Sequence, residues 1–352
     1  MIFKEKEIRE YLNRLYNEPV IFEAVEDIGR GAHGKGYRIV FTVGGKQKRL
    51  VLKGLEGDRG LGHDYPSDRA AVFILAKESY KFLPKHVGAI DVGIIRKDGT
   101  IGSMGDFEDF FLLMDEAEGS DYFGDLRLMK DKEILDELDR KRIMAMVRYL
   151  AEIHSVKKDS ADLYWRKLRD TIGHGECLMG VLDTYRDVKF TDLSEMAEIE
   201  KKCVEWRKRL KPFYSRCCQI HGDFHPGNIL FKEGDNFILL DRSRGMFGEP
   251  ADDVTALTIN YIFMSVMAHG ELRAPYDEAL ELFYDEYVYL TGDKDIFYVV
   301  APFYAFRGVV IANPLFYPDV SNENRKKIFN FIHGVLDTDR FDLKDINRYL
   351  RL

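Results

Sequence analysis

The 352-residue sequence has little cysteine and no long apolar run. Its four cysteines form no C-x-x-C pair, which argues against a disulfide framework and a zinc site and favours a reducing compartment such as the cytoplasm. Because it contains no stretch of about 18 uninterrupted apolar residues, we expect no membrane-spanning helix. The nearest candidate, residues 257–268, contains Asn260 and is expected to form a buried helix.

Positive charge is in slight deficit, with 52 Lys and Arg against 60 Asp and Glu and a net charge of −8. An acidic chain is a poor general binder of nucleic acid, so no nucleic-acid partner is expected. Residues 1–15 alternate charges in a helical pattern and lack the apolar run of a signal peptide. With 45% hydrophobic and 32% charged residues, we expect a cytoplasmic globular protein of about two domains and no extensive disorder.

Strand patterns dominate the first 114 residues, and helical patterns dominate the rest. Five strands and one helix, residues 67–82, are expected in the first part; the strands are residues 22–28, 37–43, 50–52, 92–95 and 110–114. Helices are expected later, with two short strands at 229–231 and 237–240; the helices are residues 132–155, 193–214, 251–268, 276–289, 295–312 and 322–336. The sequence thus predicts an α+β protein with an N-terminal domain (1–114), a short hinge (115–119) and a helical C-terminal domain (120–352).

A glycine-rich turn stands between two strand patterns near the amino terminus. Gly29, Gly31 and Gly34 have the spacing G-x-G-x-x-G, and the β-branched and aromatic residues 37–43 follow them. A dinucleotide-binding turn would open a helix, whereas a glycine-rich turn between strands covers nucleotide phosphates in kinases. The motif predicts a phosphate-binding loop, and a plain hairpin turn is the alternative interpretation.

Lys53 follows the apolar residues 50–52 and ends a predicted strand. A lysine in this position can neutralise the α- and β-phosphates of a nucleotide when a carboxylate orients it. Asp68, at the start of the next helix, and Glu78 are the two candidate carboxylates. A solvated lysine at a strand edge is the alternative.

Residues 221–231 (HGDFHPGNILF) and 237–241 (FILLD) are the most informative segment. Asp223 can accept a hydrogen bond from a substrate hydroxyl and orient it toward a γ-phosphate. Asn228 and Asp241 offer the hard oxygen ligands that Mg²⁺ prefers. The neighbouring glycines and proline disfavour the helix that a zinc-binding pair of histidines would need. The segment therefore predicts a kinase-type site.

These segments resemble the aminoglycoside phosphotransferase family, which is similar to choline, fructosamine and homoserine kinases and has a protein-kinase-like fold. Three further segments agree with the family in the same order. They resemble its hinge, the helix end before its substrate-binding insert, and its G-D-P-A-x-D segment; the residues are 112–119 (LLMDEAEG), 150–154 (LAEIH) and 248–253 (GEPADD). The resemblance implies a bilobal fold, with the five-stranded antiparallel sheet and one helix in the first lobe and a mainly helical second lobe.

The resemblance also implies a role for each matching residue. Asp223 would be the catalytic base, and Asn228 and Asp241 would be the magnesium ligands. Lys53 would bind phosphate. Asp253 would brace the catalytic loop.

The main chain of Asp115, Glu116 and Ala117 would hold adenine in a member of this family. The implied cofactors are ATP, or GTP as in some relatives, and Mg²⁺. The implied reaction transfers the γ-phosphate to the hydroxyl of an aminoglycoside-, choline- or sugar-like small molecule. This acceptor would bind beside a helical insert at residues 164–216.

Two departures from the family pattern concern charged residues. Arg242 and Arg244 stand near Asp241 where the family more often has an aromatic residue and an acid, so they could bind an anionic substrate or pair with carboxylates. Asp68, the second departure, is one methylene shorter than the glutamate expected at its position.

Arg307 lies inside an apolar run, and both a functional interpretation and pairing with a carboxylate in the core are open.

Two other functions are open to this sequence. A kinase for a protein or RNA is disfavoured because the GEPADD segment follows Asp241 too closely for a long activation segment. A non-catalytic nucleotide-binding module is disfavoured because Asp223, Asn228 and Asp241 are all present.

Overall fold

The computed structural model describes residues 4–31, 34–56, 66–103, 109–242 and 244–351, except for the side chains of residues 67, 68, 109 and 110. The chain divides into two units. The first comprises Met1–Glu118 with Ile238–Ser243, and the second comprises Gly119–Phe237 with Arg244–Leu352. The return of residues 238–243 to the first unit differs from the sequence prediction, which assigns them to the C-terminal domain.

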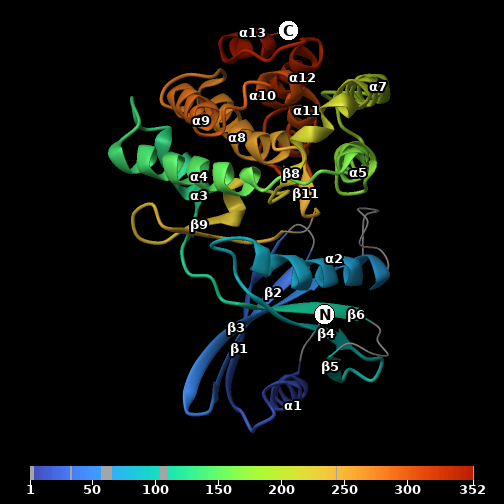
Figure 1. Cartoon of the computed structure of the whole chain (residues 1–352), viewed down its shortest axis with the longest axis vertical. Coiled ribbons are helices and arrows are strands. Elements are labelled where there is room, and N and C mark those ends of the chain that lie inside the picture. The colour runs from blue at the N-terminus through green and yellow to red at the C-terminus, as the bar shows by residue number, and fades with distance from the viewer. Residues whose placement is uncertain (1–3, 32–33, 57–65, 104–108, 243, 352) are drawn as a thin grey trace. The chain divides into compact units, whose positions relative to one another are not determined.

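A six-stranded antiparallel sheet of order β1-β2-β3-β6-β4-β5 organises the first unit (Figure 1). Its elements are α1 (Glu5–Tyr16), β1 (Ile21–Arg30), β2 (Gly34–Val43), β3 (Lys46–Leu55), α2 (Pro66–Ser79), a 3₁₀ turn (Tyr80–Phe82), β4 (Ala89–Ile95), β5 (Ile101–Ser103) and β6 (Asp109–Asp115). The predicted number of five strands is therefore one too low. The missed strand, β5, has only three residues, too few for an alternating pattern to stand out.

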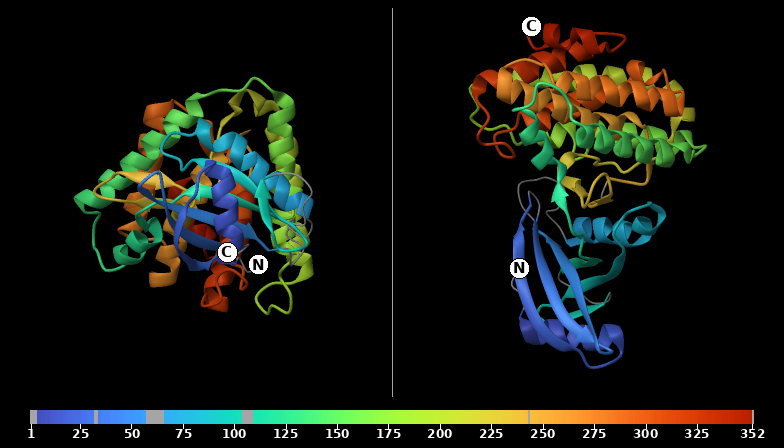
Figure 2. Two further views of the ribbon diagram at one scale, coloured as in Figure 1. Left: turned by 90° about the horizontal axis from the view of Figure 1, so that it is seen from below. Right: turned by 90° about the vertical axis from the view of Figure 1, so that its left-hand side faces the viewer.

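The two faces of this sheet are covered by different helices, α1 and α2 (Figure 2). Successive side chains of a strand point to opposite faces, so β6 contributes to two cores. Phe111 and Leu113 pack in the cluster that includes α1, whereas Leu112 and Met114 pack in the cluster that includes α2. The apolar run of β6 is thus explained by burial on both sides. Helix α1 agrees with the helical pattern of residues 1–15, which the expected count of one helix did not include.

The second unit is mainly helical. Its helices are α3 (Tyr122–Met129), α4 (Glu137–Ser155), α5 (Ala161–Gly173), α6 (Leu178–Leu182), α7 (Leu193–Leu210), α8 (Ala251–His269), α9 (Tyr276–Thr291), α10 (Ile296–Val299), α11 (Ala301–Ile311), α12 (Asn322–Leu336) and α13 (Ile346–Tyr349), with 3₁₀ turns at Lys211–Arg216, Pro226–Asn228 and Leu343–Asp345. Its short strands are β7 (Ser120–Asp121), β8 (Cys218–Gln219), β9 (Ile229–Phe231) and β11 (Phe247–Gly248); β10 (Phe237–Leu239) begins in this unit and ends in the first. Residues 295–312, predicted as one helix, form α10 and α11, because Pro302 stands at the first turn of α11.

Helix α8 lies at the centre of the second unit and packs against α9, α11 and α12. Most of its residues are buried on every side, as expected for residues 257–268. The helix ends at Gly270, which has a φ of 78° and forms a left-handed cap. Among the described helices, none combines the length and apolar character that crossing a membrane requires.

Candidate active site

The first turn of α8 braces the segment that contains Asp223. Strand β8 pairs with β11, which brings residues 218–219 beside 247–248, just before α8. Asp253 Oδ2 accepts a hydrogen bond from the His221 N–H, and Asp253 Oδ1 accepts one from the Gly222 N–H, both at 2.7 Å. The buried Asp253 thus fixes the backbone immediately before Asp223.

His154, in the last turn of α4, holds the other side of Asp253. Its Nε2 lies 3.2 Å from Asp253 Oδ2, and its Nδ1 lies 2.8 Å from the Tyr287 hydroxyl. Burial alone would raise the pKa of Asp253, but His154 and the His221 N–H hold it below the usual carboxyl value. Asp253 is therefore a stable carboxylate, and the LAEIH segment supplies its histidine partner.

Hydrogen bonds within the loop set the conformation of residues 223–228. The Asn228 amide donates from Nδ2 to the Asp223 carbonyl at 3.0 Å, which leaves Oδ1 as the oxygen of that side chain. His225 Nδ1 accepts from the Gly227 N–H at 3.1 Å. This tautomer places the imidazole proton on Nε2, which lies 3.8 Å from Asp223 Oδ2.

Two arginines hold the carboxylate of Asp223 through one of its oxygens. Arg307 Nη1, from α11, lies 2.7 Å from Oδ1, and Arg244 Nη1 contacts the same atom. Burial alone would raise the pKa of Asp223, but electrostatic interactions with Arg244, His225 and Arg307 hold it far below the usual carboxyl range. Asp223 is therefore ionised throughout the physiological pH range.

The ion pairs continue from Asp223 to Asp252 in the first turn of α8. Arg307 Nη2 lies 2.7 Å from Asp252 Oδ1, and Lys167 Nζ, from α5, lies 2.8 Å from Asp252 Oδ2. Lys167 also donates to the Arg244 carbonyl at 3.1 Å. Lys167 and Asp252 are not among the residues predicted for the site. The position of Lys167 among the buried residues of α5, which include Tyr164 and Leu168, is the signal that could have indicated it.

The glycine turn lies between the antiparallel strands β1 and β2, as its motif predicts. Gly29 has a φ of 117°, which favours glycine, and the Gly31 N–H donates to the Gly34 carbonyl at 2.9 Å. A Cβ on Gly34 would lie 1.9 Å from the Gly54 carbonyl oxygen of β3. Residues 32 and 33 lie outside the described residues, and the structure describes the loop on either side of them.

Gly34→Ala is expected to destabilise the first unit by about 1–3 kcal/mol, because the new methyl group clashes with backbone that cannot rotate away. Gly31→Ala is the matched control, since a Cβ there would come no closer than 4.0 Å to the Gly34 carbonyl oxygen. Urea denaturation of both variants measures the difference. Equal midpoints would show that the close approach of β2 and β3 is not a constraint.

Lys53 contacts Asp241 within the first unit. Lys53 lies on β3 between Gly36 of β2 and Leu112 of β6, and its Nζ is 2.9 Å from Asp241 Oδ1. Asp241 has a φ of 58°, an uncommon backbone conformation that recurs at functional sites. The side chain of Asp68, the carboxylate expected to orient the lysine, lies outside the described residues. Glu78 makes no described contact with Lys53.

The expected adenine-binding residues begin at Asp115, the last residue of β6. The Asp115 N–H donates to the Gly88 carbonyl at 3.3 Å. The carboxylate of Glu116 pairs with Arg38 of β2, and Ala117 packs against the α2 core. The side chains of Glu116 and Ala117 and the N–H of Asp115 thus anchor this segment within the first unit.

Arg242 and Arg244, the two arginines near Asp241, belong to different units. Arg242 is buried in the first unit and donates from Nη1 to the Ser79 carbonyl at 3.2 Å, at the end of α2. Arg244 belongs to the second unit and contacts Asp223. Arg242 therefore has a structural contact, whereas Arg244 and Arg307 lie against the predicted base.

The metal ligands predicted from the sequence divide between the units, with Asp241 in the first and Asn228 in the second. Both offer hard oxygen atoms, so their chemistry fits Mg²⁺. Among the described residues, no group of three or more His, Cys, Asp or Glu side chains is placed to hold a metal ion.

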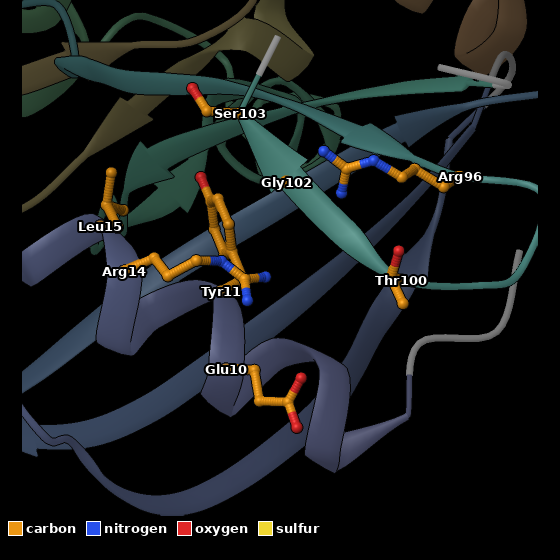
Figure 3. A pocket seen from close by; sticks show the side chains of 8 residues that line it. All are labelled: Glu10, Tyr11, Arg14, Leu15, Arg96, Thr100, Gly102 and Ser103. Atoms are coloured by element: carbon orange, nitrogen blue, oxygen red, sulfur yellow. The ribbon is translucent and has the colours of Figure 1, made fainter. Parts of the chain in front are cut away.

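A pocket of about 610 Å³ lies in the first unit, between α1 and β5, and contains none of the predicted site residues (Figure 3). Its lining is Glu10, Tyr11, Arg14, Leu15, Arg96, Thr100, Gly102 and Ser103. Arg14 is used to fix β5, because its Nη2 donates to the Ile101 carbonyl at 2.7 Å. Arg14 therefore supports the edge of the sheet.

A sequence model of the phosphotransferase enzyme family matches residues 96–288, more than half of the chain. The chain belongs to this family. The match includes the hinge segment, Asp223, Asn228, Asp241 and Asp253, and it ends before Arg307. A comparison with curated proteins gave no match.

Solved structures show that this phosphotransferase shares the expected protein-kinase-like fold. Amicoumacin kinase hAmiN, in complex with AMP-PNP, Ca²⁺ and Ami, is 13% identical with a TM-score of 0.57 over 98% of this chain and 97% of that chain. Aminoglycoside phosphotransferase APH(4)-Ia is 13% identical with a TM-score of 0.52, over 95% and 98%. Choline kinase from Cryptosporidium parvum Iowa II is 10% identical with a TM-score of 0.50, over 93% and 86%.

Proposed function

We propose that this phosphotransferase transfers the γ-phosphoryl group of ATP to a hydroxyl of a small molecule, with Asp223 as the base. The observation that carries the proposal is the carboxylate of Asp223. Oδ1 is held by Arg244 and Arg307, and the described contact of Oδ2 is with His225 at 3.8 Å, too long for a hydrogen bond. Oδ2 can therefore accept a hydrogen bond from an acceptor hydroxyl.

In the proposed reaction, the acceptor oxygen forms a bond to the γ-phosphorus while the bond from that phosphorus to the bridging oxygen breaks. The electron pair of the broken bond leaves with ADP, and the hydroxyl proton passes to Asp223 Oδ2. Because phosphoryl transfer has a loose transition state, the main work of the carboxylate is to orient the hydroxyl. Asp223 suits that role because its low pKa keeps it ionised and because Asp253 fixes the backbone immediately before it.

Lys53 and the glycine turn would bind the phosphates of ATP, and the backbone at residues 115–117 would bind adenine. Asn228 and Asp241 would hold Mg²⁺, which offsets phosphate charge when it is bound. The complex of hAmiN with AMP-PNP supports an ATP-type nucleotide as the donor. The neighbours named for aminoglycosides, choline and amicoumacin support a small molecule as the acceptor.

The proposal is tested by transfer of label from γ-labelled ATP into a fractionated cell extract with Mg²⁺. Label is expected in the small-molecule fraction. Label that enters only protein or RNA would contradict a small-molecule acceptor, and the absence of all transfer with an intact nucleotide site would contradict catalysis.

Lys53→Met is expected to lower this transfer on the order of a hundredfold, because it removes a cation that faces the developing phosphate charge. Lys46→Met removes an exposed lysine from the other end of β3 and is the matched control. Initial rates at saturating acceptor, with nucleotide affinity measured in parallel, check the prediction. Equal rates for the two variants would remove Lys53 from the proposed site.

A further inference from the structure

The guanidinium groups of Arg244 and Arg307 do more than neutralise Asp223. Both meet one carboxylate oxygen, and both lie near the ring of Phe306, with the guanidinium carbons 5.7 and 4.6 Å from its centroid. Arg307 also reaches Asp252 and the Gly222 carbonyl. The two cations are thus fixed in place beside the predicted base.

Each of these arginines retains a buried N–H group that lacks a hydrogen-bond acceptor among the described residues. These groups are Nε of Arg244 and Nε of Arg307, and the Arg307 residue is only 5% exposed. Buried donors in proteins nearly always have an acceptor, because an unsatisfied one loses its hydration without compensation. Pairing with Asp223 therefore accounts for only part of the hydrogen-bonding capacity of these side chains.

Among the described residues, the charged network that contains Asp223 comprises three cations and three carboxylates. The cations are Lys167, Arg244 and Arg307, and the carboxylates are Asp223, Asp252 and Glu176, whose charge acts on Arg244. His225 faces Asp223 through Nε2. Burial and the charge of Asp223 raise the pKa of Tyr317 to about 12, so this neighbour also stays a protonated donor.

Such a site requires acceptor atoms from its ligand. An ammonium group brings only donors and would add positive charge beside two fixed guanidinium groups. A carboxylate or phosphate brings oxygen acceptors, and its hydrogen bonds to guanidinium are charge-assisted.

We propose that the phosphate acceptor carries an oxyanion, a carboxylate or a phosphate, near its reacting hydroxyl, and that Arg244 and Arg307 bind this group. The inference rests on the proposed function, because Asp223 Oδ2 has to face the hydroxyl. It assigns Arg244, which departs from the family pattern, to substrate selection.

The test compares four three-carbon compounds that differ in charge: glycerol, 2-amino-1,3-propanediol, glycerate and glycerol 3-phosphate. Calorimetry measures their binding to the full chain in the presence of AMP-PNP and Mg²⁺, so that the nucleotide phosphates occupy their own site. Tighter binding of glycerate or glycerol 3-phosphate is expected, and the stronger of the two identifies carboxylate or phosphate. Equal behaviour of all four compounds, including a shared failure to bind, overturns the inference.

Arg244→Gln is expected to weaken binding of the preferred anion at least roughly tenfold, since one charge-assisted contact is lost. Arg166→Gln removes an exposed arginine from α5 and is the matched control. If Arg244→Gln does not fold, Arg244→Lys is used instead. This variant keeps the positive charge but removes the planar guanidinium group, and the same loss of anion affinity is expected. Unchanged anion binding in a folded Arg244 variant overturns the inference.

The label-transfer experiment separates this inference from the proposed function. Transfer to a neutral or cationic acceptor, with no preference for anions, would leave the kinase function standing and overturn the oxyanion site. Failure of transfer to any acceptor, while anions still bind through Arg244, would contradict the function and retain the site.

Discussion

Asp223→Asn is expected to lower phosphoryl transfer roughly 10²- to 10⁴-fold, the range typical for loss of a positioned general base. The amide keeps the shape of the side chain but cannot take up the hydroxyl proton. ATP binding should persist, because the predicted nucleotide residues Lys53 and Asp115 belong to the other unit. Single-turnover rates and nucleotide affinity, measured on the same preparation, separate the two effects.

Asp235→Asn is the matched control for this substitution, because Asp235 is an exposed carboxylate in the turn between β9 and β10. Thermal melting of both variants is needed, since Asp223→Asn leaves Arg244 and Arg307 without their shared anion. Turnover of Asp223→Asn at the rate of the control would show that another group orients the acceptor. A fall in melting temperature without a change in turnover would make Asp223 a purely structural residue.

Asp253→Ala is expected to destabilise the second unit by at least about 3 kcal/mol, because three buried donors lose their acceptor and each costs about 1–3 kcal/mol. It would leave the His221 N–H, the Gly222 N–H and His154 Nε2 without their acceptor. Denaturant titration monitored by tryptophan fluorescence checks the size of the effect.

Asp285→Ala, which removes an exposed carboxylate from α9, is the control for Asp253→Ala. The pKa of Asp253 is lowered in the folded state, so its stabilising effect is present above the usual carboxyl pKa of about 3.9. That effect is lost as the pH falls through the lower folded value. The stability difference between the two variants should therefore shrink on strong acidification. A difference that does not change with pH would contradict the conclusion that Asp253 is ionised when it holds the backbone before Asp223.

The turn at residues 221–228 and its support by Asp253 could be predicted because both depend on short sequence motifs. Residues 221–228 have their turn fixed by Pro226, Gly227 and short-range hydrogen bonds, and the GEPADD segment indicates the brace. The five longer strands of the first unit follow from their β-branched and aromatic patterns. These features depend on neighbours along the chain, which a single sequence displays.

The remaining features depend on contacts between distant residues. Arg307 reaches Asp223 across 84 positions, and nothing in either neighbourhood specifies the partner. The contact of Lys53 with Asp241 was missed for the same reason. Strand β5 is too short for a pattern, and the boundary between α10 and α11 depends on a proline that a longer helical pattern masks.

The return of residues 238–243 to the first unit has a consequence for dissecting the protein. Ile238 and Leu240 pack against the core that β6 and α2 form, and Arg242 reaches the end of α2. A fragment that stops at Glu118 would therefore lack part of its own hydrophobic interior and the carboxylate that contacts Lys53. The polypeptide crosses between the units at three places, so no single cut separates them into complete pieces.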